Sequence, residues 1–215
     1  MIETVVFDLD GVLIDSEQVW DGVREELARE RGGKWHPGAQ RAMMGMSSPE
    51  WSVYMHETIA LPETPAEINR EVVARMLAIY AAGPPWLPGA LAAVRRVSAS
   101  YRLGLASSSN RELIDAVLEA GGIAGLFHET VSSEEVARGK PAPDVYLEAA
   151  RRLGADPVQC AAIEDSHGGI RSAKSAGMRV ITAPNPTYPP DDEALALADV
   201  TVGSLDELTV GVVSG

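Results

Sequence analysis

The sequence predicts an α/β fold whose core is a doubly wound parallel sheet, interrupted near its start by a helical insert. From residue 86 onward, short apolar segments alternate with amphipathic segments of helical period, which is typical of parallel strands joined by helices. Before that, a single apolar strand at residues 5–7 precedes a long helical stretch. Because this first strand needs the later sheet as its partner, we assign residues 1–15 and 86–215 to the core domain and residues 16–85 to the insert.

Three helices are expected in the helical insert. The first covers about residues 17–31, where apolar side chains recur every fourth position until Gly32-Gly33 ends the helix. The second opens at Ser48-Pro49-Glu50, with the serine as cap and the proline in the first turn. The third opens at Thr64-Pro65-Ala66-Glu67, a capping-box pattern. No strand is expected before the core resumes.

Strands and helices alternate through the rest of the core. The expected strands lie at 102–106, 128–131, 160–163, 179–182 and 199–202, and the expected helices at 89–99, 111–120, 143–153 and 168–176. Connections of this kind place helices on both faces of a parallel sheet. The only cysteine, Cys160, falls within an apolar strand, so we expect an inert core residue rather than a nucleophile.

Charge and composition limit the possible partners. The 215 residues include 18 basic and 31 acidic side chains, a formal net charge of −13. This field repels nucleic acid and anionic membranes, so neither is expected as a partner. A single cysteine excludes an intrachain disulfide, and no leader or membrane-spanning apolar segment is evident. We therefore expect a cytoplasmic protein, either a monomer or a weak homodimer.

Polar residues follow several of the expected strands at the point where each strand ends. Asp8 and Asp10 follow the first strand, Ser107 follows the second, and Glu164-Asp165 follows a later one. Lys140 lies in a turn just before a helix. Ligands of open parallel sheets bind beyond the carboxyl ends of the strands, so these side chains are expected to meet at one edge.

This combination of side chains suits one kind of chemistry. Carboxylate oxygens are ligands that Mg²⁺ prefers, and Mg²⁺ often shares its coordination shell with a substrate phosphate. A serine before a helix start can hold phosphoryl oxygens, and a lysine can stabilise developing negative charge. One carboxylate can attack phosphorus while its neighbour carries the leaving-group proton. Taken singly, each feature has an ordinary explanation as a polar loop, a surface lysine or a helix cap, and His167 is expected to be a loop or capping residue.

Four short motifs resemble those of the haloacid dehalogenase superfamily of phosphohydrolases. Asp8-Leu9-Asp10-Gly11-Val12 resembles the first motif and Leu105-Ala106-Ser107-Ser108-Ser109 the second. Gly139-Lys140-Pro141 resembles the third and Ile163-Glu164-Asp165-Ser166 the fourth. The helical insert resembles the cap domain of the branch that contains β-phosphoglucomutase and phosphoglycolate phosphatase. The resemblance covers nearly the whole chain and implies a Rossmann-like core.

The resemblance also implies roles for individual residues. Asp8 would form an aspartyl-phosphate, and Asp10 would protonate the leaving group and then activate water. Ser107, Ser108 and Lys140 would bind the phosphoryl group.

The same resemblance implies a Mg²⁺ site. Its ligands would be Asp8, the Asp10 carbonyl and Asp165, with Glu164 binding directly or through water. The dehalogenases of the family do not need a second acid at the position of Asp10. The presence of Asp10 therefore favours phosphate over halide chemistry.

The residues that would select the substrate depart from the pattern of the mutase-like members. Mutase-like members carry a histidine where this chain has Trp20, which either lines an apolar substrate wall or completes the packing of its helix. Mutases also grip a second phosphate with an arginine of the cap, whereas the local pattern here, which begins at Gly45, offers serines. Arg24 and Arg41 are the alternative candidates for this role from elsewhere in the insert. Our candidate substrate-binding residues are Trp20, Arg24, Gly45 and Asn110.

Three hypotheses about function follow. The first is a Mg²⁺-dependent phosphatase that hydrolyses a small phosphorylated metabolite, a sugar phosphate or a phosphoglycolate-like compound, through an aspartyl-phosphate. The second is a sugar-phosphate mutase of the β-phosphoglucomutase type. The third is a metabolite-binding or interaction module without activity, which the complete set of acids, hydroxyl and lysine argues against.

Overall fold

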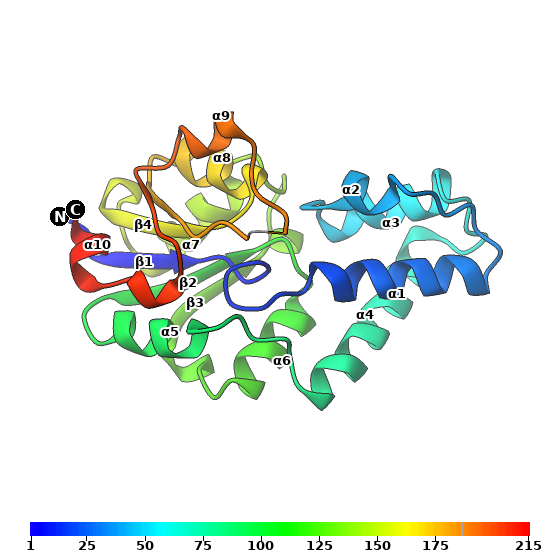
Figure 1. Ribbon diagram of the computed structural model, residues 1–215, viewed down its shortest axis with the longest axis horizontal. Coiled ribbons are helices and arrows are strands. Elements are labelled where there is room, and N and C mark those ends of the chain that lie inside the picture. The colour runs from blue at the N-terminus through cyan, green and yellow to red at the C-terminus, as the bar shows by residue number, and fades with distance from the viewer. Residues whose placement is uncertain (186) are drawn as a thin grey trace.

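The core of the protein is a six-stranded parallel sheet, seen in a computed structural model that describes residues 1–185 and 187–215 (Figure 1). The strand order is β3-β2-β1-β4-β5-β6. The strands are β1 (Thr4–Phe7), β2 (Arg102–Ser107), β3 (Phe127–Ser132), β4 (Cys160–Glu164), β5 (Arg179–Thr182) and β6 (Val200–Thr201). Every pairing among them is parallel, so the predicted α/β class is confirmed.

The register of the central strands determines where the first acidic residues emerge. Phe7, the last residue of β1, pairs with Leu105 of β2 on one side and with Ile163 of β4 on the other. Asp8 and Glu164, each one residue further along, therefore reach the same edge of the sheet. The chain order changes direction at β1, and in open α/β sheets this is where ligands bind.

Helices cover both faces of the sheet. They are α5 (Ala90–Ser98), α6 (Arg111–Ala120), α7 (Asp144–Leu153), α8 (His167–Ser175), α9 (Asp192–Leu195) and α10 (Val210–Ser214), with 3-10 turns at Ala124–Leu126, Ser133–Glu135, Pro157–Gln159 and Leu205–Glu207. Helices α7, α8 and α9 pack on the face that receives Val6, and α5, α6 and α10 pack on the face that receives Val5 and Phe7. This alternation follows from the period of two residues along a strand.

The insert contains four helices, which extend from the site edge of the sheet (Figure 1). They are α1 (Glu17–Glu30), α2 (Ala39–Met43), α3 (Ser48–Glu57) and α4 (Pro65–Ala82). No strand occurs within residues 16–85, all of which the structure describes. The buried apolar side chains of these helices continue the cluster beneath α5 and α6, so the insert packs firmly on the core. The boundaries of a separate insert domain remain a prediction.

Two helix starts can be compared with their sequence signals. The capping box at Thr64 is present, with its hydroxyl accepting from the amide of Glu67. The cap of α3 is Ser47 rather than Ser48, because Ser47 and Glu50 form the reciprocal capping box. Ser48 is the first helical residue instead, and its hydroxyl is free to bond elsewhere. None of the described helices is both long and apolar enough to span a bilayer.

Candidate functional site

The turn after β1 brings Asp8 and Asp10 to the edge of the sheet. Asp8 is buried, with 5% of its surface exposed. Gly11 follows in a left-handed conformation with φ of 81°. A Cβ atom at this position would lie 1.9 Å from Oδ2 of Asp165. The glycine therefore allows both the turn and the close approach of a third carboxylate.

Lys140 joins Asp8 to Glu164. Its ammonium group donates to Oδ1 of Asp8 at 2.8 Å and to Oε1 of Glu164 at 2.6 Å, and all three side chains are buried. Burial lowers the pKa of Lys140, but the two carboxylates outweigh this effect and hold the pKa above its ordinary value. Lys140 is therefore a permanent cation within reach of the first carboxylate.

Both carboxylate oxygens of Glu164 accept hydrogen bonds from neighbouring groups. Its Oε1 also accepts from the hydroxyl of Tyr146 at 2.7 Å. Its Oε2 accepts from the amides of Asp165 and Ser166 and from the Ser166 hydroxyl, at 3.1–3.3 Å. Since both oxygens are engaged, Glu164 is best placed to orient Lys140.

Three buried carboxylates lie together at this edge. Oxygen atoms of Asp8, Glu164 and Asp165 lie within 4.8 Å of one another. Oδ1 of Asp165 is buried and accepts no hydrogen bond from any residue that the structure describes. Burial raises the pKa of Asp8 to about 8 despite Lys140, and burial together with the neighbouring carboxylates raises the pKa of Asp165 well above its ordinary value. An excess of buried carboxylates with an unpartnered oxygen fits a hard divalent cation such as Mg²⁺.

The carboxylate of Asp10 is held from two sides. Oδ1 accepts from the hydroxyl of Ser16 and from the indole N–H of Trp20 at 3.2 Å. Oδ2 accepts from the hydroxyls of Ser109 at 2.7 Å and Ser107 at 3.3 Å. Ser16 makes no side-chain cap bond to α1, because its hydroxyl points to Asp10 instead.

Trp20 completes the packing of its helix, which is one of the two roles considered for it, and its place on a substrate wall remains a prediction. Its indole N–H reaches Asp10, and its ring packs against Trp51, with ring centroids 5.9 Å apart. An indole N–H only donates, so Oδ1 of Asp10 is the acceptor in this contact.

The loop after β2 offers the expected hydroxyls. Ser107 is fully buried, and its hydroxyl accepts the amide of Ser109 at 3.0 Å. The hydroxyl oxygen of Ser108 is buried and lacks a hydrogen-bond partner among the described residues. Helix α6 begins at Arg111 directly after this loop, and the amide of Arg111 donates to Oε2 of Glu134 at 3.0 Å. The Ser108 hydroxyl can therefore bind a phosphoryl group without first breaking a hydrogen bond of its own.

The side chain of Asn110 forms hydrogen bonds that link the insert to the core. Its Oδ1 accepts from Ser48 of α3 at 2.8 Å. Its amide nitrogen donates to Asn69 of α4 at 3.2 Å and to Glu134 at 2.7 Å. Its place at this junction is clear, whereas a contact with substrate remains a prediction.

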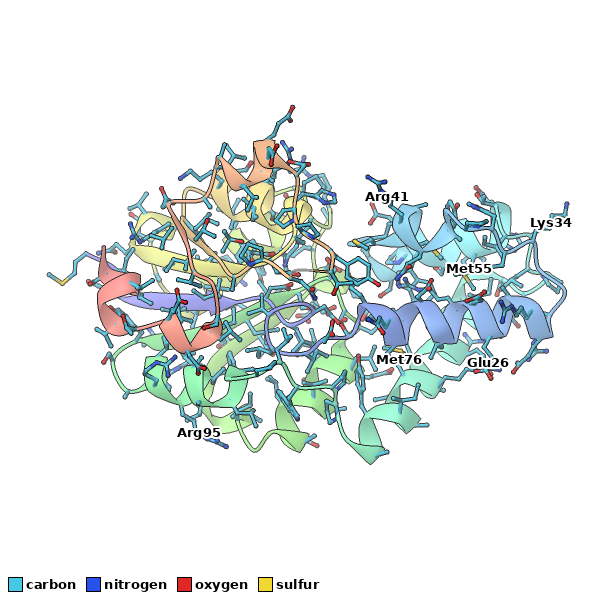
Figure 2. The ribbon with its side chains drawn as sticks, in the orientation of Figure 1. Glu26, Lys34, Arg41, Met55, Met76 and Arg95 are labelled. Atoms are coloured by element: carbon cyan, nitrogen blue, oxygen red, sulfur yellow. The ribbon has the colours of Figure 1, made fainter. Side chains whose placement is uncertain are left out.

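The remaining candidates differ in exposure. Arg24 is buried, and its guanidinium carbon lies 4.7 Å from the ring centroid of Trp20 and 4.8 Å from that of Trp51. Gly45 and Arg41 are exposed, and Arg41 points outward at the edge of the insert (Figure 2). Trp20 therefore contacts both residues, Arg24 with its ring and Asp10 with its indole N–H.

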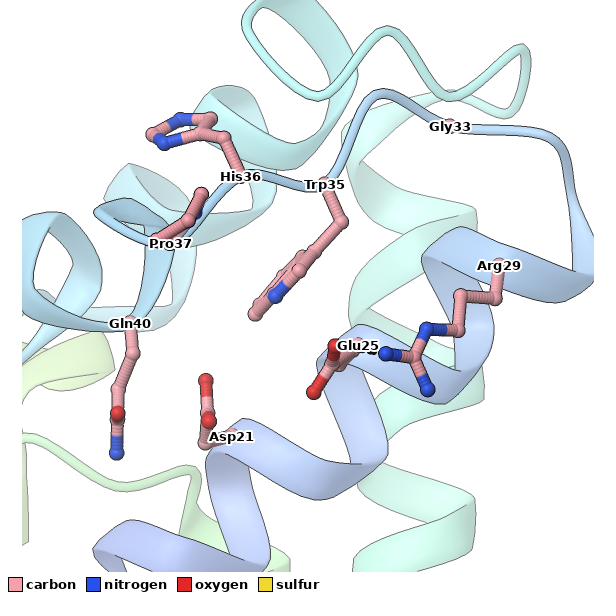
Figure 3. A pocket seen from close by; sticks show the side chains of 8 residues that line it. All are labelled: Asp21, Glu25, Arg29, Gly33, Trp35, His36, Pro37 and Gln40. Carbon is pink, nitrogen blue, oxygen red and sulfur yellow. Dashed lines mark hydrogen bonds and ion pairs between the residues drawn. The ribbon is translucent and has the colours of Figure 1, made fainter.

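A cavity of about 460 Å³ lies beside α1 within the insert (Figure 3). It is lined by Asp21, Glu25, Arg29, Gly33, Trp35, His36, Pro37 and Gln40. None of the residues predicted for catalysis lines it. The reactive groups instead lie buried between the insert and the sheet.

Several residues of the site were not predicted from the sequence. Glu17 has a pKa raised to about 7, because of burial and the nearby carboxylate of Asp10. Ser109 could have been found from its place in the serine run, but Tyr146 follows the periodicity of an ordinary core helix. His167 is neither a loop nor a capping residue, because it is the first residue of α8 and Ser166 is the cap; its side chain is exposed. Cys160 is buried in β4 as expected, and burial raises the pKa of its thiol to about 11.

Comparison with known proteins identifies the family. A model of haloacid dehalogenase-like hydrolases matches residues 2–177. Hexitol phosphatase B of Escherichia coli (strain K12) is 34% identical over 214 residues, covering 97% of this chain and 95% of the relative. The crystal structure of CbbY from Rhodobacter sphaeroides in complex with phosphate matches with a TM-score of 0.88 at 27% identity and covers 100% of both chains.

A second solved structure, β-phosphoglucomutase from Clostridium difficile, matches with a TM-score of 0.84 at 26% identity and covers 99% of this chain and 95% of its own. The relatives thus include both phosphatases and a mutase. The family expected from the four motifs is confirmed, as is the general class of enzyme. The chain belongs to the haloacid dehalogenase-like hydrolases.

Proposed function

We propose that this protein is a Mg²⁺-dependent phosphatase that hydrolyses a small phosphorylated metabolite through an aspartyl-phosphate. The observation that carries the proposal is the arrangement of Asp8 and Asp165: one carboxylate is held by Lys140, and the other presents an unpartnered buried oxygen beside it. The phosphatases among the relatives support the same reaction class.

In the first step, the oxygen of Asp8 that Lys140 does not hold attacks phosphorus. The new bond joins this oxygen to phosphorus, and the bond from phosphorus to the ester oxygen breaks. Asp10, in its protonated form, gives its proton to the departing ester oxygen. The hydroxyls of Ser107 and Ser108 hold the phosphoryl oxygens by hydrogen bonds.

In the second step, water attacks the phosphorus of the aspartyl-phosphate. Asp10 now accepts the proton of this water, and the bond between Asp8 and phosphorus breaks to release phosphate. Lys140 remains charged throughout and offsets negative charge on the phosphoryl oxygens. Bound Mg²⁺, held by Asp8, Asp165 and the Asp10 carbonyl, would neutralise charge on the same oxygens.

Replacing the nucleophile tests the proposal. Asp8→Asn should abolish release of p-nitrophenol from p-nitrophenyl phosphate, because a carboxamide cannot attack phosphorus. Asp115→Asn changes an exposed aspartate of α6 in the same way and should keep wild-type turnover. Ordinary turnover by Asp8→Asn would contradict the mechanism.

The products separate hydrolysis from transfer. With β-glucose 1-phosphate, free phosphate is the product of a phosphatase and glucose 6-phosphate is the product of a mutase. We expect free phosphate, and we expect that EDTA stops its release and that added Mg²⁺ restores it. Predominant glucose 6-phosphate would identify a mutase, and no turnover of any phosphate ester would identify a binding module.

A further inference from the structure

The guanidinium group of Arg24 is buried, and its Nε has no hydrogen-bond partner among the described residues. Only 6% of the residue is exposed. Its Nε–H donates to no acceptor, and the side chain forms no ion pair within residues 1–185 and 187–215. Buried arginines are normally paired, because removing a charge from water is costly. A group left unpaired in this way is prepared to bind something that the chain itself does not supply.

The location of Arg24 connects it to the reacting groups. Glu17, Trp20 and Arg24 recur at helical spacing, so they lie along one face of α1. Trp20 contacts Arg24 with its ring face and Asp10 with its indole N–H. Since Asp10 delivers the proton to the leaving group, Arg24 lies on the side of the site where the leaving group must be held.

The surroundings of Arg24 are acidic. Burial lowers its pKa to about 10, and the carboxylates of Glu17, Asp10 and Asp21 partly offset this effect. Three carboxylates therefore lie near this guanidinium without forming an ion pair with it among the described residues. The other buried cation of the site, Lys140, is already shared by two carboxylates. A second phosphate or a carboxylate on the substrate would meet more negative than positive charge here.

We propose that Arg24 and Glu17 bind the hydroxyl groups of an uncharged, polyhydroxylated leaving group. The guanidinium supplies donors in a planar fork, and the carboxylate of Glu17 supplies acceptors. The rings of Trp20 and Trp51 hold the guanidinium in place by cation–π contact. The enzyme therefore selects phosphate monoesters of neutral sugars or polyols over compounds with a second anionic group. This inference rests on the proposed phosphatase function.

A matched pair of substrates tests the selection. Glucitol 6-phosphate and 6-phosphogluconate have the same carbon chain and differ at the far end, where one carries a hydroxyl and the other a carboxylate. The wild-type kcat/KM should be at least about tenfold higher for glucitol 6-phosphate, as expected for a repelled or unpaired charge. Equal or better turnover of 6-phosphogluconate would overturn the proposal.

A variant tests the residue. In Arg24→Met, the ratio of kcat/KM for glucitol 6-phosphate to that for p-nitrophenyl phosphate should fall by about tenfold to a hundredfold, because only the first substrate has hydroxyls to bind. Arg95→Met, at an exposed position of α5 far from the site, should keep the wild-type ratio (Figure 2). A ratio unchanged in Arg24→Met would overturn the proposal.

Two further results keep the test decisive. If Arg24→Met does not fold, Arg24→Lys retains the charge without the planar fork and should lower the same ratio. A wild-type protein that turns over neither substrate nor p-nitrophenyl phosphate would refute the phosphatase function itself. Turnover of p-nitrophenyl phosphate without preference between the matched pair would refute only the role of Arg24 and Glu17.

Discussion

Replacing Glu17 by glutamine should stabilise the protein more at pH 8 than at pH 5. Burial and the charge of Asp10 raise the pKa of Glu17 from 4.5 to about 7 in the folded state. A carboxyl group with a raised pKa binds its proton more tightly when folded, so stability is lost as pH rises from the unfolded pKa through the folded one. At 1.36 kcal/mol for each pKa unit, full ionisation costs about 3 kcal/mol, of which about 2 kcal/mol falls between pH 5 and pH 8.

Urea denaturation of wild type and Glu17→Gln in EDTA measures this difference. Titrations that the two proteins share largely cancel when their free energies of unfolding are subtracted at each pH. The gain from the substitution should grow by about 2 kcal/mol from pH 5 to pH 8. Glu26→Gln, at an exposed position on the same helix, should shift the free energy by a constant amount within about 0.5 kcal/mol (Figure 2). A constant gain for Glu17→Gln would refute the reasoning about its burial.

Two other substitutions test contacts around the site. A Cβ atom at Gly169 would lie 1.8 Å from Oε1 of Glu164, so Gly169→Ala should displace this carboxylate and lower kcat by about a hundredfold. Gly168→Ala is the control: the nearest atom to its Cβ lies at 4.0 Å, and this variant should retain activity. Equal activity of the two alanine variants would contradict this. Asn110→Ala should lower the free energy of unfolding by about 1–3 kcal/mol and speed amide hydrogen exchange in α3, because the Ser48 hydroxyl loses its partner. Exchange as slow as in the wild type would show that this contact does not hold the insert.

The sheet and its reactive edge could be predicted because they depend on local patterns. Each strand is a short apolar segment that ends in polar residues, and parallel strands present their carboxyl ends together. These patterns alone predict that Asp8, Lys140 and Asp165 meet at one edge of the sheet. Helices α2 and α9 were not predicted, because four or five residues are too few to establish a helical period.

The partners of the site residues could not be predicted in the same way. The bonds of Asp10 to Ser16 and Trp20 depend on how α1 docks against the turn after β1. The bonds of Glu164 depend on main-chain amides of its own loop and on a tyrosine from α7. These are tertiary contacts, and the residue type alone does not indicate which carboxylate oxygen already accepts a hydrogen bond.

The central position of β1 has a consequence for the synthesis of the chain. Its residues, Thr4–Phe7, are made before those of every other strand of the sheet, and its neighbours β2 and β4 begin only at Arg102 and Cys160. At translation rates of about 5–20 residues per second, this apolar strand waits on the order of ten seconds for its second partner. Both edges of β1 therefore stay unpaired until β2 has been made, and the edge that pairs with β4 stays open for longer still.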